Sequence, residues 1–102
     1  MTLDEIVGEM QKQADVLKPL NHIVLFDLGD DGKVLLDATG DEVKITPNPA
    51  SDDAETTLVL SPENMMKLMN GDLNPMVAFT MGCLKVFGSK GIALKLSSLL
   101  DK

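Results

Sequence analysis

The segment at residues 65–88 constrains the fold of this chain more than any other part of it. Its 24 residues hold five of the seven methionines, two of the three phenylalanines and the only cysteine. Two helix starts stand just before and within it, Ser61-Pro62 and Asn74-Pro75, each a capping side chain followed by proline. Gly71 and Gly82 follow at positions typical of helix ends. The segment therefore predicts two short helices back to back.

The second of these helices, at residues 76–81, is apolar almost all the way round. A helix without a water-facing side should be buried or should line something. Methionine side chains are unbranched and polarizable, so a methionine-rich surface can adapt to different shapes. Two interpretations stay open from these residues alone, an ordinary core rich in methionine and a surface that contacts a ligand.

The N-terminus predicts an amphipathic helix of about four turns. Thr2 and Glu5 have the spacing of a capping box, and Pro19 is expected to end the helix. The apolar positions at helical spacing are Leu3, Ile6, Val7, Met10, Ala14 and Leu17. This helix is expected to face the core.

Five strands are predicted, at residues 21–28, 33–39, 42–46, 56–60 and 84–87. Both faces of the first are largely apolar, which predicts an interior strand covered on both sides. The first two should form a hairpin around the turn at residues 29–32, and the third should be half-exposed.

The last element is a helix at residues 89–100, with an apolar stripe at Ile92, Leu96, Leu99 and Leu100. The order is helix, three strands, strand, two helices, strand, helix. It favours an α+β fold with one sheet and the helices gathered on its apolar face. At 102 residues the chain is expected to be a single domain, residues 1–102.

The charge of the chain is acidic and uneven. The net charge is 9 − 16 = −7, with 4 − 13 = −9 in residues 1–60 and 5 − 3 = +2 in residues 61–102. An acidic chain without arginine is a poor nucleic-acid binder, and docking on anionic membranes should be at most transient. The acidic N-terminus and the lack of a long apolar run favour a cytoplasmic protein.

Nothing in the sequence predicts an enzyme, a metal site or a cofactor. The aspartates at 27, 30, 31 and 37 miss the calcium-loop pattern, because Gly29 and Ala38 fall where ligands are required. His22 is the only histidine and has no partner for a zinc site. Lys85 could lower the pKa of the Cys83 thiol if both lie on a strand, but no base is evident nearby.

From residue 54 onward the chain contains a series of short motifs: Ala54-Glu55-Thr56-Thr57-Leu58, Asn70-Gly71-Asp72-Leu73-Asn74-Pro75, Ala78-Phe79, Gly82, Leu84-Lys85-Val86, Gly88 and Ala93-Leu94-Lys95-Leu96. In these motifs and their order the chain resembles the sterol carrier protein-2 family. The resemblance implies helices over a five-stranded sheet, enclosing an apolar tunnel. It also implies binding and transfer of lipids (fatty acids, acyl-CoA esters, phospholipids, sterols or isoprenoids) without covalent chemistry.

Three residues depart from the pattern of that family. Glu55 stands where aspartate is usual, and Ser89 replaces an acid or amide after Gly88. Cys83 takes the place of one of two strand lysines, which removes a positive charge where an anionic headgroup could sit. The missing charge weakens the expectation of acyl-CoA or anionic lipid binding, and the acidic chain weakens transfer by collision with anionic membranes.

If the tunnel exists, the lipid tail should decide affinity. Burying one methylene contributes about 0.8 kcal/mol, whereas an exposed lysine–carboxylate contact contributes at most about 1 kcal/mol. The predicted lining residues are Met65, Met66, Leu68, Met69, Met76, Phe79, Met81, Ile92, Leu96, Leu99 and Leu100. The headgroup candidates are Lys85, Lys90 and Lys95. The alternative function is an interaction or dimerisation module that presents an apolar groove to a partner.

Overall fold

Strand β1 (Ile23–Asp27) lies at the centre of a five-stranded sheet in the computed structural model, which describes residues 2–51 and 53–100. The strand order is β3-β2-β1-β4-β5. β1 pairs in parallel with β4, and the other neighbours are antiparallel. The remaining strands are β2 (Lys33–Asp37), β3 (Lys44–Pro47), β4 (Thr56–Val59) and β5 (Lys85–Gly88). All five predicted strands are therefore present, with ends displaced by one or two residues.

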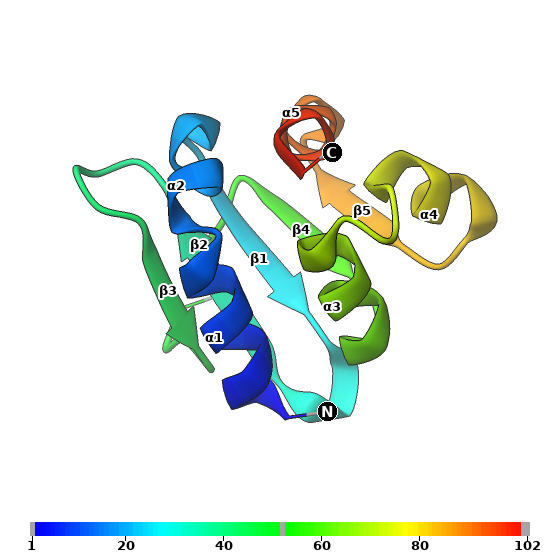
Figure 1. Ribbon diagram of the computed structural model, residues 1–102, viewed down its shortest axis with the longest axis horizontal. Coiled ribbons are helices and arrows are strands. Elements are labelled where there is room, and N and C mark those ends of the chain that lie inside the picture. Colours follow the sequence, from blue (N-terminus) through cyan, green and yellow to red (C-terminus); the bar gives the residue numbers. More distant parts are fainter. Residues whose placement is uncertain (1, 52, 101–102) are drawn as a thin grey trace.

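The helices gather on one face of this sheet, where α1, α2, α3 and α5 lie in front of the strands (Figure 1). Their bounds are α1 (Leu3–Lys12), α2 (Ala14–Leu17), α3 (Pro62–Asn70), α4 (Pro75–Met81) and α5 (Lys90–Leu100), with 3-10 turns η1 (Lys18–Leu20) and η2 (Gly29–Asp31). The α+β fold with a five-stranded sheet is thus confirmed. The core between the two layers is built from leucine, isoleucine, valine and methionine around Phe26.

The two faces of β1 differ in how they are covered. Val24 and Phe26 point toward the helices and are fully buried. On the opposite face Leu25 is only 3% exposed, between its cross-strand neighbours Leu35 and Thr57. Ile23 and Asp27, on that same face, are half-buried. The prediction of cover on both sides holds for Leu25 in the middle of the strand and is wrong for Ile23 and Asp27 at its ends, on a face that no helix covers.

The predicted four-turn N-terminal helix is interrupted at Gln13. α1 ends there with non-helical dihedral angles (φ −95°, ψ 9°), and the Gln13 side-chain amide donates a hydrogen bond of 3.1 Å to the carbonyl of Met69 at the end of α3. The capping box of Thr2 and Glu5 is present as predicted. The α-helix ends at Leu17, just before Pro19 as predicted, and Pro19 lies in the 3-10 turn η1, where its missing N–H costs no hydrogen bond.

Both predicted helix starts in the methionine-rich segment are confirmed. The Ser61 hydroxyl accepts a hydrogen bond from the N–H of Asn64, and the Asn74 side chain accepts from Met76 and Val77. Gly71 and Gly82 end α3 and α4 in left-handed conformations, with φ of 81° and 83°. Glycine takes this conformation without the steric cost that other residues meet.

Candidate functional site

Helix α4 is the element whose burial differs most from what the sequence predicts. Pro75 and Ala78 are buried, whereas Val77, Phe79 and Met81 are exposed. The expectation that an all-apolar helix should be buried is therefore wrong for half of this one. The other expectation, that it lines something, agrees with its position beside a cavity.

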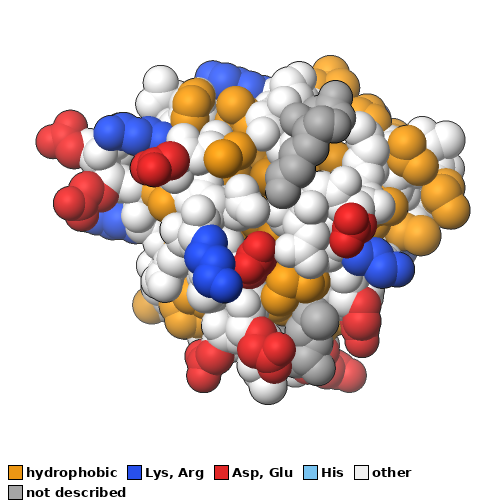
Figure 2. All heavy atoms as spheres, in the orientation of Figure 1, with side chains coloured by type: hydrophobic (Ala, Val, Ile, Leu, Met, Phe, Trp, Pro, Cys, Tyr) orange, Lys and Arg blue, Asp and Glu red, His pale blue; other side chains and the backbone are white. Residues whose placement is uncertain are grey.

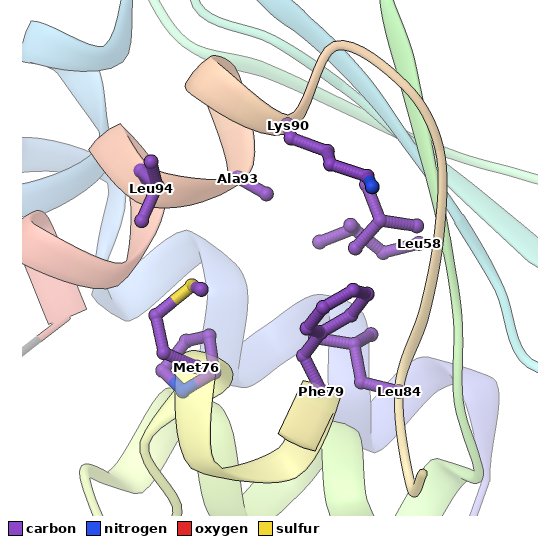
Figure 3. Close-up of a pocket in the computed structure, with 9 residues that line it drawn as sticks. Leu58, Met76, Phe79, Leu84, Lys90, Ala93 and Leu94 are labelled. Carbon is purple, nitrogen blue, oxygen red and sulfur yellow. The ribbon is translucent and has the colours of Figure 1, made fainter.

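This cavity has a volume of about 150 Å³ and lies between α4, α5 and the strands β4 and β5. In Figure 3 Met76 rises from α4 toward Leu94 of α5, and Phe79 rises from α4 toward Leu58 and Lys90. The residues that line it are Leu58, Pro75, Met76, Phe79, Leu84, Val86, Lys90, Ala93 and Leu94. Eight of these nine side chains are apolar, so the cavity can bury an apolar group of a ligand but offers it few hydrogen-bond partners.

Lys90 is the charged member of the lining. It stands at the start of α5, and its Nζ atom lies 5.9 Å from the centre of the Phe79 ring. A lysine ammonium at this distance from an aromatic face is attracted by the ring quadrupole. The contact holds a positive charge beside the apolar cavity, where an anionic group of a ligand could reach it.

The predicted site residues fall into three structural groups. Met76, Phe79 and Lys90 line the cavity. The others on the helices belong to the core or its margin, with Met65, Leu68, Met69, Ile92, Leu96 and Leu100 buried and Met66 and Leu99 packed against them. Met81, Lys85 and Lys95 are exposed and do not line the cavity. For all three groups, contact with a ligand stays a prediction.

Six lining residues were not among the predicted set: Leu58, Pro75, Leu84, Val86, Ala93 and Leu94. Some of them had a signal in the sequence. Side chains alternate between the two faces of a strand, so Val86 points to the face opposite to Lys85 and Phe87. An apolar side chain between two such neighbours is expected to face the helices. Leu94 had none, because it lies off the apolar stripe of α5 and is exposed.

The described part of the chain has few groups of polar side chains that could bind a metal ion or take part in a reaction. Residues 2–51 and 53–100 contain no cluster of three histidine, cysteine or acidic side chains that could hold a metal ion. Cys83 is a free, exposed cysteine that precedes β5. A second hollow, between α2 and the loop before β3, is lined partly by the charged residues Asp15, Lys18, Asp41 and Glu42.

One polar contact joins the residues that precede β1 and β4. Nδ1 of His22 lies 2.9 Å from one carboxylate oxygen of Glu55, and the other accepts a 3.1 Å hydrogen bond from the N–H of Ile23. The Ile23 bond first, and the His22 bond second, lower the pKa of the Glu55 carboxyl. This arrangement ties the segment before β4 to the start of β1.

Residues 3–101 match the sequence profile of the SCP-2 sterol transfer family. The chain belongs to this family. Hydroxysteroid dehydrogenase-like protein 2 from Homo sapiens is 32% identical over 90 residues, which cover 86% of this chain and 22% of that protein. The chain thus spans about a fifth of the length of this relative.

Solved structures of the SCP-2 family share the fold of this chain. Apo sterol carrier protein 2 from Yarrowia lipolytica superposes with a TM-score of 0.69 at 24% identity, over 94% of this chain and 84% of that one. The sterol carrier protein domain 2 of Helicoverpa armigera gives a TM-score of 0.71 at 25% identity, over 95% and 80%. None of the helices described in this SCP-2 chain combines the length and apolar character needed to cross a bilayer.

Proposed function

We propose that this SCP-2 family chain binds and carries a lipid or similar hydrophobic molecule, with its tail in the cavity between α4 and α5. The observation that carries the proposal is the lining of that cavity, eight apolar side chains and one lysine. The ligand classes are those that the family resemblance implies: fatty acids, acyl-CoA esters, phospholipids and sterols or isoprenoids. Residues 1–102 act together as one carrier domain.

Helix α4 is the wall that adapts to the ligand. A cavity of about 150 Å³ is smaller than the roughly 300–1,000 Å³ of typical ligand pockets, so a lipid tail must displace part of its lining. α4 has seven residues, follows the glycine turn at Gly71, ends at Gly82 and packs mainly against α5. Its inward side chains include Met76, which can repack around different shapes. A short helix with so few partners moves at lower cost than α3, whose side chains fill the core.

The tail dominates affinity in this proposal. Each buried methylene contributes about 0.8 kcal/mol, while a contact between Lys90 and an anionic headgroup contributes at most about 1 kcal/mol. The protein therefore accepts tails of several kinds and discriminates weakly among headgroups. Since eight of the nine lining side chains are apolar and Lys90 has no acid or histidine beside it in the lining, the domain acts as a carrier rather than as a catalyst.

The test is displacement of a fluorescent fatty acid from the purified protein. Ala93 is buried and lines the cavity, so Ala93→Leu fills part of the space and should weaken binding about tenfold or more. Ser98 is exposed on the same helix, and Ser98→Leu adds a leucine there without entering the cavity. Urea unfolding of both variants checks that the fold is retained.

Two results would refute the proposal. One is the absence of displaceable binding at micromolar concentrations of the wild-type protein. The other is equal affinity of Ala93→Leu and Ser98→Leu, which would place the ligand elsewhere on the molecule.

A further inference from the structure

The opening of the cavity is marked by the lining residues that also meet solvent. Three of the nine lining residues are exposed, Phe79 on α4 and Lys90 and Leu94 on α5. The other six are buried or half-buried. Because the Phe79 side chain lines the cavity and is also 37% exposed, its ring lies between the cavity and the solvent. Figure 3 shows this ring rising from α4 toward Lys90.

Helix α4, which carries Phe79, is held mainly from one side. It packs mainly against α5, whereas Val77 and Met81 on its outer side are 50% and 69% exposed. Figure 2 shows hydrophobic side chains along the margin of the molecule where Figure 1 draws α4. A short helix with few buried contacts opens locally at a lower free-energy cost than the helices that fill the core.

The start of α5, which carries Lys90, is instead anchored to the sheet. The N–H of Ser89 donates a hydrogen bond of 3.3 Å to the carbonyl of Glu55, and the Ser89 hydroxyl accepts one of 3.3 Å from the N–H of Ile92. Both carboxylate oxygens of Glu55 are bonded near the start of β1. Within residues 2–51 and 53–100 Lys90 forms no ion pair, and its Nζ atom lies 5.9 Å from the centre of the Phe79 ring. The ammonium therefore has a fixed base and an aromatic partner on a helix that can move.

The size of the cavity requires this movement when a ligand enters. A cavity of about 150 Å³ holds a group of about the size of benzene. A longer chain enters only if α4 moves away from α5, and that movement separates the Phe79 ring from the Lys90 ammonium.

We propose that the contact between Lys90 and Phe79 is a latch between α5 and α4, and that it selects single-chain ligands with an anionic headgroup by their rate of entry. The inference rests on the proposed carrier function and names the ligands that the same site takes up fastest. At exposed sites an ammonium contact with a carboxylate is about as strong as one with an aromatic ring. An arriving carboxylate thus replaces the ring at little cost and opens the latch.

A neutral ligand of the same chain length has nothing to offer the ammonium. It enters only when the latch opens by itself, which makes its entry about two- to fivefold slower. Since the latch is closed in both the empty and the loaded protein, it slows the entry and the release of a neutral ligand by the same factor. The selection therefore lies in rates, while the tail still decides affinity.

The test is stopped-flow uptake of a fluorescent fatty acid and of the fatty alcohol with the same chain and fluorophore. The wild-type protein should take up the acid about two- to fivefold faster than the alcohol. Lys90→Gln and Phe79→Leu should each speed uptake of the alcohol about two- to fivefold, and the variant with both changes should be no faster than either. The alcohol is the decisive ligand, because a lysine that merely attracts carboxylates would leave its uptake unchanged.

Matched controls come from the same two chemical types outside the cavity lining. Phe87→Leu removes an exposed aromatic ring from β5, and Lys95→Gln removes an exposed lysine from α5. Both controls should take up the acid and the alcohol at the wild-type rates. Circular dichroism of all variants checks that they fold.

Hydrogen exchange of the α4 amides tests the latch without any ligand. Exchange should be about two- to fivefold faster in Lys90→Gln and Phe79→Leu than in the wild type, because the contact no longer holds α4 against α5. It should be unchanged in Phe87→Leu and Lys95→Gln.

The outcomes separate the latch from the carrier function. Normal uptake of both ligands, with alcohol uptake and α4 exchange unchanged in Lys90→Gln, would refute the latch alone. Independent effects of Lys90→Gln and Phe79→Leu that multiply in the double variant would also refute it. Uptake of neither ligand by the wild type would refute the carrier function and with it the selection of ligands, whereas faster α4 exchange in Lys90→Gln would still show that the contact holds α4.

Discussion

At the scale of single residues, the ammonium group of Lys90 is the charge that borders the apolar cavity. We expect Lys90→Gln to weaken fatty-acid binding by at most about fivefold, because an exposed ion pair contributes no more than about 1 kcal/mol. A fatty alcohol of the same chain length should bind both proteins equally. Competition against a fluorescent fatty acid measures both affinities.

Lys95→Gln is the matched control, because Lys95 lies on the same helix and is exposed outside the cavity. It should change neither affinity. A larger loss with the alcohol than with the acid would contradict a headgroup role for Lys90.

Gly88, at the end of β5, is packed so closely against the neighbouring backbone that a larger residue would not fit. Its φ is 96°, and a Cβ atom there would lie 2.6 Å from the carbonyl oxygen of Glu55. We expect Gly88→Ala to lower the free energy of unfolding by about 3 kcal/mol or more, from backbone strain plus this clash. Gly82 has a similar φ of 83° but open space around it, so Gly82→Ala should cost only about 1 kcal/mol.

Urea unfolding of both glycine variants measures the difference. Equal losses of stability would show that the left-handed backbone alone, and not the contact with Glu55, makes glycine necessary at position 88.

At the scale of elements, α3 and α4 share the same start and end signals but differ in what they pack against. α3 buries Met65, Leu68 and Met69 completely, whereas α4 rests mainly on α5. Removing a capping side chain costs about 1 kcal/mol at either helix. Loss of the cap should therefore lower the stability of the whole fold for α3, but only the stability of the helix itself for α4.

We therefore expect Ser61→Ala to lower the free energy of unfolding by about 1 kcal/mol. Asn74→Ala, which removes the acceptor for the N–H groups of Met76 and Val77, should mainly speed hydrogen exchange in α4 and lipid exchange from the cavity. Urea unfolding and site-resolved hydrogen exchange separate the two effects. Equal exchange rates across α4 in Asn74→Ala and wild type would contradict the view of α4 as the adaptive wall.

The ends of the helices show which features can be predicted from residues close in sequence and which cannot. The cap residues of α3 and α4 were predictable because capping is decided by contacts within four residues along the chain. The break at Gln13 was not, since its side chain bonds to Met69, 56 positions away. The exposure of Val77 and Met81 was not predictable either, because an apolar helix carries no signal for which side meets solvent.

At the scale of the whole molecule, the parallel pair of β1 and β4 joins the N-terminal strands to the antiparallel pair of β4 and β5. The Glu55 carboxylate, bonded to the Ile23 N–H and to His22, ties the ends of this pair together. Since these bonds lower the pKa of Glu55 in the folded state, the ionised carboxylate stabilises the fold above the ordinary pKa of glutamate. That contribution is lost as the pH falls through the lowered pKa.

We expect Glu55→Gln to be less stable than the wild type near neutral pH and to approach it in stability as the medium is acidified below about pH 4. Urea unfolding from neutral pH down to about pH 3 tests this. Glu63→Gln, at an exposed position in the first turn of α3, is the control for loss of a carboxylate that has no such pair of bonds. A stability difference between Glu55→Gln and wild type that does not change with pH would contradict the linkage.

The sequence by itself determined the strands, the order of the elements and the caps of α3 and α4, because these depend on periodicity and on contacts between near neighbours. Its motifs from residue 54 onward carried the family resemblance. Only the tertiary structure decided which apolar residues fill the core and which line the cavity. Met65 and Met76 have the same chemistry, yet the first is fully buried under the helical layer and the second borders the cavity. That difference arises from how α4 and α5 pack over β4 and β5, and no local pattern encodes it.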